Sequence, residues 1–175
     1  MIEMNSHKTD VNNYRGVIPA MITPCRAPGV PDRAGMTNLA RILVGEGCHG
    51  LFVLGSTGEL PFLDEDQRCE MVIAAREGAG EKAKIYAGIS GTGIKQVIGY
   101  ANNAARDGAD VAIAMAPFFL KLDQAGLYEY ITEIADKSSI PIGIYNHLRM
   151  PSVFDIETIL RLAQHPNIVA MKVPA

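Results

Sequence analysis

The chain has 175 residues, of which 48% are hydrophobic and 20% are charged. This composition is that of a globular protein with a sizeable core, and it excludes an intrinsically disordered chain. The net charge of −3, with no basic stripe, gives no support for a nucleic-acid partner. The longest apolar run, residues 111–120, has ten residues, whereas a membrane-spanning helix needs about 20, so we expect no membrane partner.

The cysteines and histidines show none of the spacings that bind metals. Cys25, Cys48 and Cys69 lie far apart with no CxxC motif, and the four histidines form no HxH or HExxH motif. The sequence therefore predicts free thiols, a reducing cytoplasm and no metal site.

Residues 1–13 are polar and lack a signal-peptide core, so we expect a flexible N-terminal tail followed by one domain, residues 14–175. In this domain, short apolar runs alternate with longer stretches of helical period. The expected strands are 16–23, 50–55, 84–89, 109–116, 140–146 and 168–172. The expected helices between them are 32–46, 64–79, 94–107, 124–138 and 155–164.

One strand and one helix recur about every 30 residues, which is the length of a β–α unit in a parallel sheet. The chain thus contains six such units, the last without its helix. A doubly wound sheet fits the length of 175 residues, whereas a (β/α)8 barrel typically needs about 250. Length alone therefore favours the doubly wound sheet.

The residues at the expected strand ends favour the barrel instead. They are Thr23, "GSTGE" (55–59), "GISGTG" (88–93), "PFF" (117–119), "YN" (145–146) and Lys172. In a doubly wound sheet only some strand ends meet, at a switch point, whereas in a barrel all of them converge on one mouth.

Four of these residues carry chemistry that would be useful at such a mouth. An uncharged Lys172 amine could attack a ketone and form a Schiff base, although a strand-terminal lysine can also simply reach out to solvent. Tyr145 could move protons beside it, or be an ordinary buried tyrosine. Ser56 and Thr57, between two glycines, could bind a carboxylate or phosphate, or form a plain turn.

Taken together, these motifs resemble the dihydrodipicolinate synthase/N-acetylneuraminate lyase family of class I aldolases. The resemblance rests on "GVIPAMITP", "GSTGE", "AGIS", "PFF", "IYN" and "HPNIVAMK", in this order and spacing. It implies a (β/α)8 TIM barrel, of which this chain holds the first six strands, usually assembled as a homotetramer. It also implies that Lys172 forms the Schiff base with pyruvate or another 2-oxo acid, that Tyr145 transfers protons, and that Ser56 and Thr57 bind the substrate carboxylate. No cofactor is implied.

Two departures from the synthase branch bear on the second substrate, which would be an aldehyde. Phe119 stands where that branch has a tyrosine, and Arg149 lies one position early. We therefore expect aldol cleavage or condensation of a 2-keto-3-deoxy sugar acid, with His147 and Arg149 as candidate contacts. The alternatives are dihydrodipicolinate synthase itself and a non-catalytic protein that binds 2-oxo acids. Because the sequence stops after "MKVPA", we also expect a fragment or truncated form of a longer chain.

Overall fold

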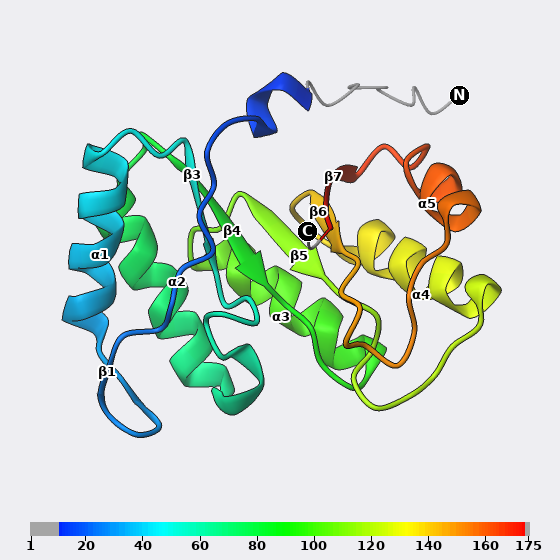
Figure 1. The fold of residues 1–175 in the computed structure, drawn as a ribbon, viewed down its shortest axis with the longest axis horizontal. Coiled ribbons are helices and arrows are strands. Elements are labelled where there is room, and N and C mark those ends of the chain that lie inside the picture. Colours follow the sequence, from blue (N-terminus) through cyan, green and yellow to red (C-terminus); the bar gives the residue numbers. More distant parts are fainter. Residues whose placement is uncertain (1–10, 174–175) are drawn as a thin grey trace.

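Five parallel strands form the central sheet, and they follow one another in chain order, β3-β4-β5-β6-β7 (Figure 1). The computed structural model describes residues 11–173. The strands are β3 (Gly50–Val53), β4 (Lys84–Gly88), β5 (Val111–Ala114), β6 (Ile142–Tyr145) and β7 (Ile168–Lys172). Because the order does not reverse within this sheet, it has no switch point, and the doubly wound alternative is wrong.

Helices precede and connect these strands at the predicted places. They are α1 (Arg33–Gly45), α2 (Glu65–Ala79), α3 (Ile94–Arg106), α4 (Gln124–Lys137) and α5 (Ile156–Leu162), and each boundary lies within two residues of its prediction. A capping box begins α2. The Gln67 N–H donates to Asp64 Oδ1 at 2.8 Å, and the Asp64 N–H donates to Gln67 Oε1 at 3.1 Å.

The first predicted strand, 16–23, is not a regular strand. It lies beside β3 but forms only one isolated bridge, between Ala20 and Phe52. The Met21 N–H donates to the Phe52 carbonyl at 2.8 Å, and the Phe52 N–H donates to the Pro19 carbonyl at 3.0 Å. Pro19 has no N–H to donate to this ladder, so beyond it the segment contributes only the Val17 carbonyl, which accepts from the Gly50 N–H at 3.4 Å.

Three short elements were not predicted. An antiparallel hairpin joins β1 (Cys25–Ala27) to β2 (Val30–Pro31), and two 3-10 turns, η1 (Val11–Tyr14) and η2 (Leu60–Phe62), flank the first units. Residues 1–10 of the predicted tail, 1–13, lie outside the described residues. Residues 11–13 belong to η1.

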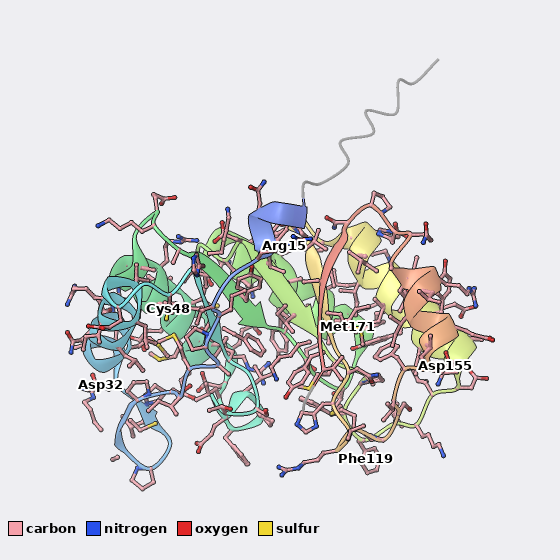
Figure 2. The ribbon with its side chains drawn as sticks, turned by 45° about the horizontal axis from the view of Figure 1, so that its top comes forward. Arg15, Asp32, Cys48, Phe119, Asp155 and Met171 are labelled. Atoms are coloured by element: carbon pink, nitrogen blue, oxygen red, sulfur yellow. The ribbon has the colours of Figure 1, made fainter. Side chains whose placement is uncertain are left out.

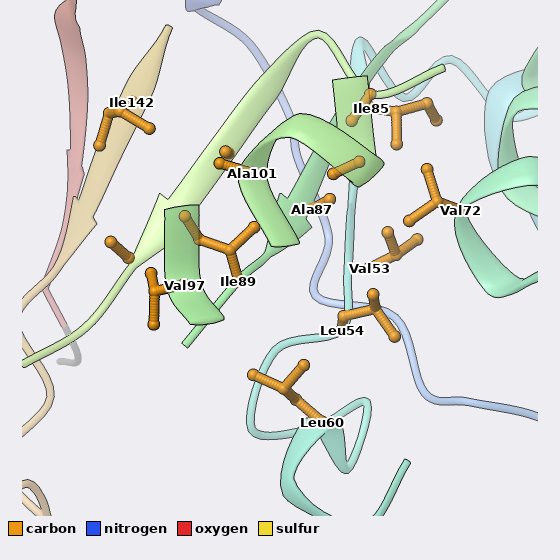
Figure 3. Packing of buried hydrophobic residues seen from close by; sticks show 14 of the residues in the cluster. Val53, Leu54, Leu60, Val72, Ile85, Ala87, Ile89, Val97, Ala101 and Ile142 are labelled. Carbon is orange, nitrogen blue, oxygen red and sulfur yellow. The ribbon is translucent and has the colours of Figure 1, made fainter. Parts of the chain in front are cut away.

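The sheet carries a different apolar cluster on each face, because side chains alternate along a strand. On the outer face, Ile85 and Ala87 of β4 pack in one cluster with Val97 and Ala101 of α3 (Figure 3). Ile85 is fully buried, and burial of a side chain of this size contributes about 2 kcal/mol. The inner face has its own cluster of six buried residues: Phe52, Tyr86, Val111, Ile113, Met115 and Tyr145.

The last strand contains one irregularity that affects the site. Ile142 pairs with Ile168, but the next residue of β6, Gly143, pairs with Ala170, so that Val169 is an extra residue in β7. This bulge brings Lys172 opposite Tyr145 in the register. Among the described residues, β7 pairs only with β6. No helix of residues 11–173 is long and apolar enough to cross a membrane.

Candidate active site

Lys172 and Tyr145 meet where β6 and β7 end. The two residues are neighbours across the strand pair, and the Asn146 N–H donates to the Lys172 carbonyl at 3.0 Å. The Lys172 Nζ lies 3.8 Å from the centroid of the Tyr145 ring, over its face. A cation in this position is attracted by the negative face of the ring. The lysine side chain is partly buried and the tyrosine is buried.

Ser56 approaches the same phenol from the loop after β3. Its Oγ lies 3.5 Å from the Tyr145 hydroxyl, and either oxygen can be the donor. The loop turns away from the strand at Leu54, which has a φ of 57°. A Cβ at Gly88 of β4 would lie 1.9 Å from the Leu54 carbonyl oxygen, so only glycine allows this turn. A left-handed leucine costs about 1 kcal/mol, and its neighbours hold it there.

Thr57 lies in the same loop and is exposed. Its hydroxyl has no hydrogen-bond partner within residues 11–173. The next residue, Gly58, accepts a hydrogen bond from the Thr23 hydroxyl at 2.6 Å, which ties the first segment of the chain to the loop. The hydroxyl of Thr57 is therefore free to bind a ligand in a loop that is anchored on both sides.

Two further rings pack against Tyr145. Its centroid lies 6.2 Å from that of Phe52 and 5.0 Å from that of His147, and both contacts are edge-to-face. Phe118 and Met150 pack on the same inner cluster. The orientation of the phenol is thus fixed by contacts on several sides.

Asn146 braces the loop that follows β6. Its amide oxygen accepts from the Phe154 N–H and its amide nitrogen donates to the Phe154 carbonyl, both at 3.0 Å. The side chain is buried, and both of its polar atoms are satisfied. This pair of bonds closes the loop of residues 147–153 beside the site.

An open cavity of about 350 Å³ lies against the inner face of the sheet. Among the described residues that line it, Lys172 is the only one with a basic side chain. Burial, with smaller contributions from Tyr14 and Asp110, raises the pKa of Tyr86 to about 12, so this phenol stays neutral at physiological pH. The lining residues are Tyr14, Ile18, Phe52, Tyr86, Ile113, Ala170, Met171, Lys172 and Val173.

Two residues that the sequence places near the mouth have exposed side chains. Phe119 is 88% exposed, has a φ of 72°, and lies at the opposite end of the molecule from Arg15 (Figure 2). Its neighbour Phe118 is the one that packs on the inner cluster. Arg149 is exposed, and only its backbone N–H contacts another site residue, the His147 Nδ1, at 3.0 Å.

Leu54, Gly88 and Phe52 also shape the site, although the sequence predicts no role for them. The glycine at the end of the third expected strand was the one available signal, because a glycine there can indicate close approach of another backbone. The left-handed leucine and the ring contact carry no such signal in the sequence.

The sequence matches the dihydrodipicolinate synthetase family over residues 13–175, and the chain belongs to this family. It is 37% identical over 157 residues to 4-hydroxy-tetrahydrodipicolinate synthase 2 of Streptomyces coelicolor, covering 89% of this chain and 52% of the relative. It is 36% identical over 162 residues to the synthase of Chelativorans sp., covering 91% and 55%.

Solved structures of the family agree with this fold. The dihydrodipicolinate synthase of Acinetobacter baumannii complexed with pyruvate superposes with a TM-score of 0.88 at 28% identity, covering 92% of this chain and 56% of that one. YagE of E. coli K12, a prophage protein of the family in complex with pyruvate, gives 0.86 at 28% identity, covering 91% and 54%. The fold is therefore that of the TIM-barrel enzymes of this family, and the chain spans about half the length of these relatives.

Proposed function

We propose that the protein carrying this chain is a class I aldolase, a carbon–carbon lyase that works through a lysine Schiff base with pyruvate or another 2-oxo acid. The observation that carries the proposal is the grouping of three side chains. The Lys172 amine lies 3.8 Å over the Tyr145 ring, and the Tyr145 hydroxyl lies 3.5 Å from Ser56 Oγ. Membership of the dihydrodipicolinate synthetase family supports the same reading.

The proposed reaction begins at Lys172. Its neutral amine adds to the C2 carbonyl of pyruvate, and loss of water leaves an iminium. The iminium withdraws electrons from the neighbouring methyl carbon, which loses a proton to give an enamine. The enamine attacks the aldehyde carbon, and water then hydrolyses the new iminium to release the product and the amine. Cleavage is the same sequence in reverse.

Tyr145 and the loop after β3 have the other roles. The phenol gives a proton to the aldehyde oxygen as the new bond forms and takes it back during cleavage, with Ser56 as relay. Thr57 and Ser56, together with backbone N–H groups of the loop, hold the carboxylate of the 2-oxo acid. No step requires a metal or an organic cofactor.

Two reactions are proposed, each favoured by a different observation. The relatives named 4-hydroxy-tetrahydrodipicolinate synthase support that activity. The exposed Phe119 and the outward Arg149 instead favour a 2-keto-3-deoxy sugar acid, because neither side chain supplies a phenol or a carboxylate-binding group within the site. Assays of pyruvate turnover with 2-keto-3-deoxy acids, N-acetylneuraminate and aspartate semialdehyde separate the two. A cytoplasmic location and a homotetramer remain predictions.

Trapping with borohydride tests the Schiff base directly. Pyruvate and borohydride should add covalent mass at Lys172, located by peptide mass spectrometry. Lys172→Ala should abolish the adduct, whereas Lys84→Ala, which removes a lysine paired with Asp110 at 3.1 Å, should retain it. Binding of pyruvate without any adduct would refute the proposal and favour a non-catalytic 2-oxo-acid-binding protein.

A further inference from the structure

His147 packs against the residue on which the proposed chemistry depends. Its ring centroid lies 5.0 Å from that of Tyr145, at an interplanar angle of 68°. The Lys172 amine lies over the face of the same phenol ring, 3.8 Å from its centroid. The imidazole and the amine therefore both contact the Tyr145 ring. His147 directly follows Asn146, whose two bonds to Phe154 fix the start of the loop.

The hydrogen bonds of His147 define which of its nitrogens carries the proton. The backbone N–H of Arg149 donates to Nδ1 at 3.0 Å, so Nδ1 is an acceptor and the proton of the neutral ring lies on Nε2. Nε2 has no hydrogen-bond partner within residues 11–173. The side chain is thus a donor whose direction is set by the backbone on one side and by a phenol ring on the other.

Burial and the neighbouring positive charges favour the uncharged form of this donor. Burial lowers the pKa of His147 below its ordinary value, and the positive charges of Arg149 and Lys172 lower it further. At neutral pH the ring is therefore the neutral tautomer with hydrogen on Nε2.

We propose that His147 is a specificity-determining residue whose Nε2–H donates a hydrogen bond to the aldehyde oxygen, the atom that becomes the C4 hydroxyl of the aldol. The aldehyde carbon must approach the carbon next to the Schiff base on Lys172, and Tyr145 must reach the aldehyde oxygen to protonate it. A group packed on the Tyr145 ring lies beside that oxygen. The substrate class is accordingly a 4-hydroxy-2-oxo acid, whose hydroxyl oxygen is recognised by a neutral donor. This inference rests on the proposed function.

Two variants separate the donor from the packing of the ring. His147→Phe keeps an aromatic ring against Tyr145 but removes the N–H, and His147→Gln restores an N–H donor at similar reach. Leu148→Ala, which truncates an exposed neighbour in the same loop, is the matched control. His147→Leu is a second donor-free variant in case the Phe side chain disturbs folding. Each variant is assayed for pyruvate trapping by borohydride and for kcat/KM with the best substrate of the panel above.

If His147 is this donor, its substitution should change kcat/KM but not the rate of pyruvate trapping. His147→Phe should lower kcat/KM about tenfold, the effect of one lost hydrogen bond, and leave the rate of trapping unchanged. His147→Gln should recover most of the loss, and Leu148→Ala should match the unaltered protein. Wild-type kcat/KM in His147→Phe, no recovery in His147→Gln, or an equal fall in trapping would overturn the inference. Trapping without turnover of any panel member would overturn it as well, whereas absence of trapping in the unaltered protein would refute the proposed function itself.

Discussion

At the scale of single residues, the face of the Tyr145 ring is placed to stabilise a positive charge. Its face lies under the Lys172 nitrogen, and a cation over a tyrosine face is stabilised by about 1 kcal/mol. The iminium of the proposed reaction carries its positive charge on this same nitrogen. In the proposed reaction, the face of the ring stabilises this intermediate, and the hydroxyl, 3.5 Å from Ser56 Oγ, exchanges protons.

Cys69 provides a prediction that is independent of the site. Burial raises the pKa of its thiol to about 11, and the hydrogen bond with Asp107 and the negative charge of that residue act in the same direction. At pH 8 only about one thiol in a thousand is then the reactive thiolate. Iodoacetamide should alkylate Cys69 much more slowly than the exposed Cys25, with the rate at Cys69 rising about tenfold per pH unit between pH 7 and 9.

Peptide mass spectrometry over time measures both rates in one sample. Equal rates at Cys25 and Cys69 in the folded protein would contradict the assignment. Unfolding in urea is the control, because it removes the burial and should make the two thiols equivalent.

The sequence brings Lys172, Tyr145 and Ser56 together because parallel strands end on the same side of a sheet, and position at a strand end can be read from the chain. It does not foresee the close approach of Leu54 to Gly88. That contact depends on the backbone of a neighbouring strand 34 residues away, and no local pattern encodes it.

At the scale of elements, helices were predictable and the first strand was not. A helix end depends on local residues, such as the Asp64 side chain that caps α2. A few consecutive residues therefore determine where a helix begins or ends. A strand needs a partner with matching donors. Segment 16–23 has a strand-like composition, but Pro19 cannot donate to β3, and the hairpin of β1 and β2 takes up the following residues.

The caps of two helices give a matched stability test. Asp64→Ala removes the side-chain acceptor of the capping box, which binds the Gln67 N–H, and should lower the free energy of unfolding by about 1 kcal/mol. Asp32 occupies the same position before α1 but makes no side-chain cap bond, so Asp32→Ala should cost distinctly less. Urea-induced unfolding followed by circular dichroism measures both, and equal losses would show that the box contributes nothing beyond the residue type.

At the scale of the whole molecule, one guanidinium joins successive β–α units at the end of the sheet where the strands begin. Arg76 of α2 donates to the carbonyls of Gly80 at 2.5 Å, Ala83 at 3.1 Å and Gly108 at 2.9 Å, and it pairs with Asp110. Asp110 also accepts from the backbone N–H at the second position of β4, at 2.8 Å. The starts of β4 and β5 are thereby tied to the helix that precedes them.

Removal of this side chain should destabilise the fold far more than removal of an exposed one. Arg76→Met leaves three carbonyls and a carboxylate short of a donor, and should lower the free energy of unfolding by about 3 kcal/mol. Arg33→Met breaks only the exposed pair with Glu77 and should cost less than about 1 kcal/mol. Thermal or urea unfolding measures both, and similar losses would rule out the linking role of Arg76.

The extra residue in the final strand has a consequence for how this chain can vary. The bulge at Val169 shifts the pairing by one position, and without this shift Tyr145 would face Met171 instead of Lys172. Straight pairing of the two strands, with Val169 in the ladder, would set the Met171 thioether opposite the phenol and move Lys172 one position further along. The spacing within these five residues therefore decides which side chain faces Tyr145, whereas their hydrophobicity does not.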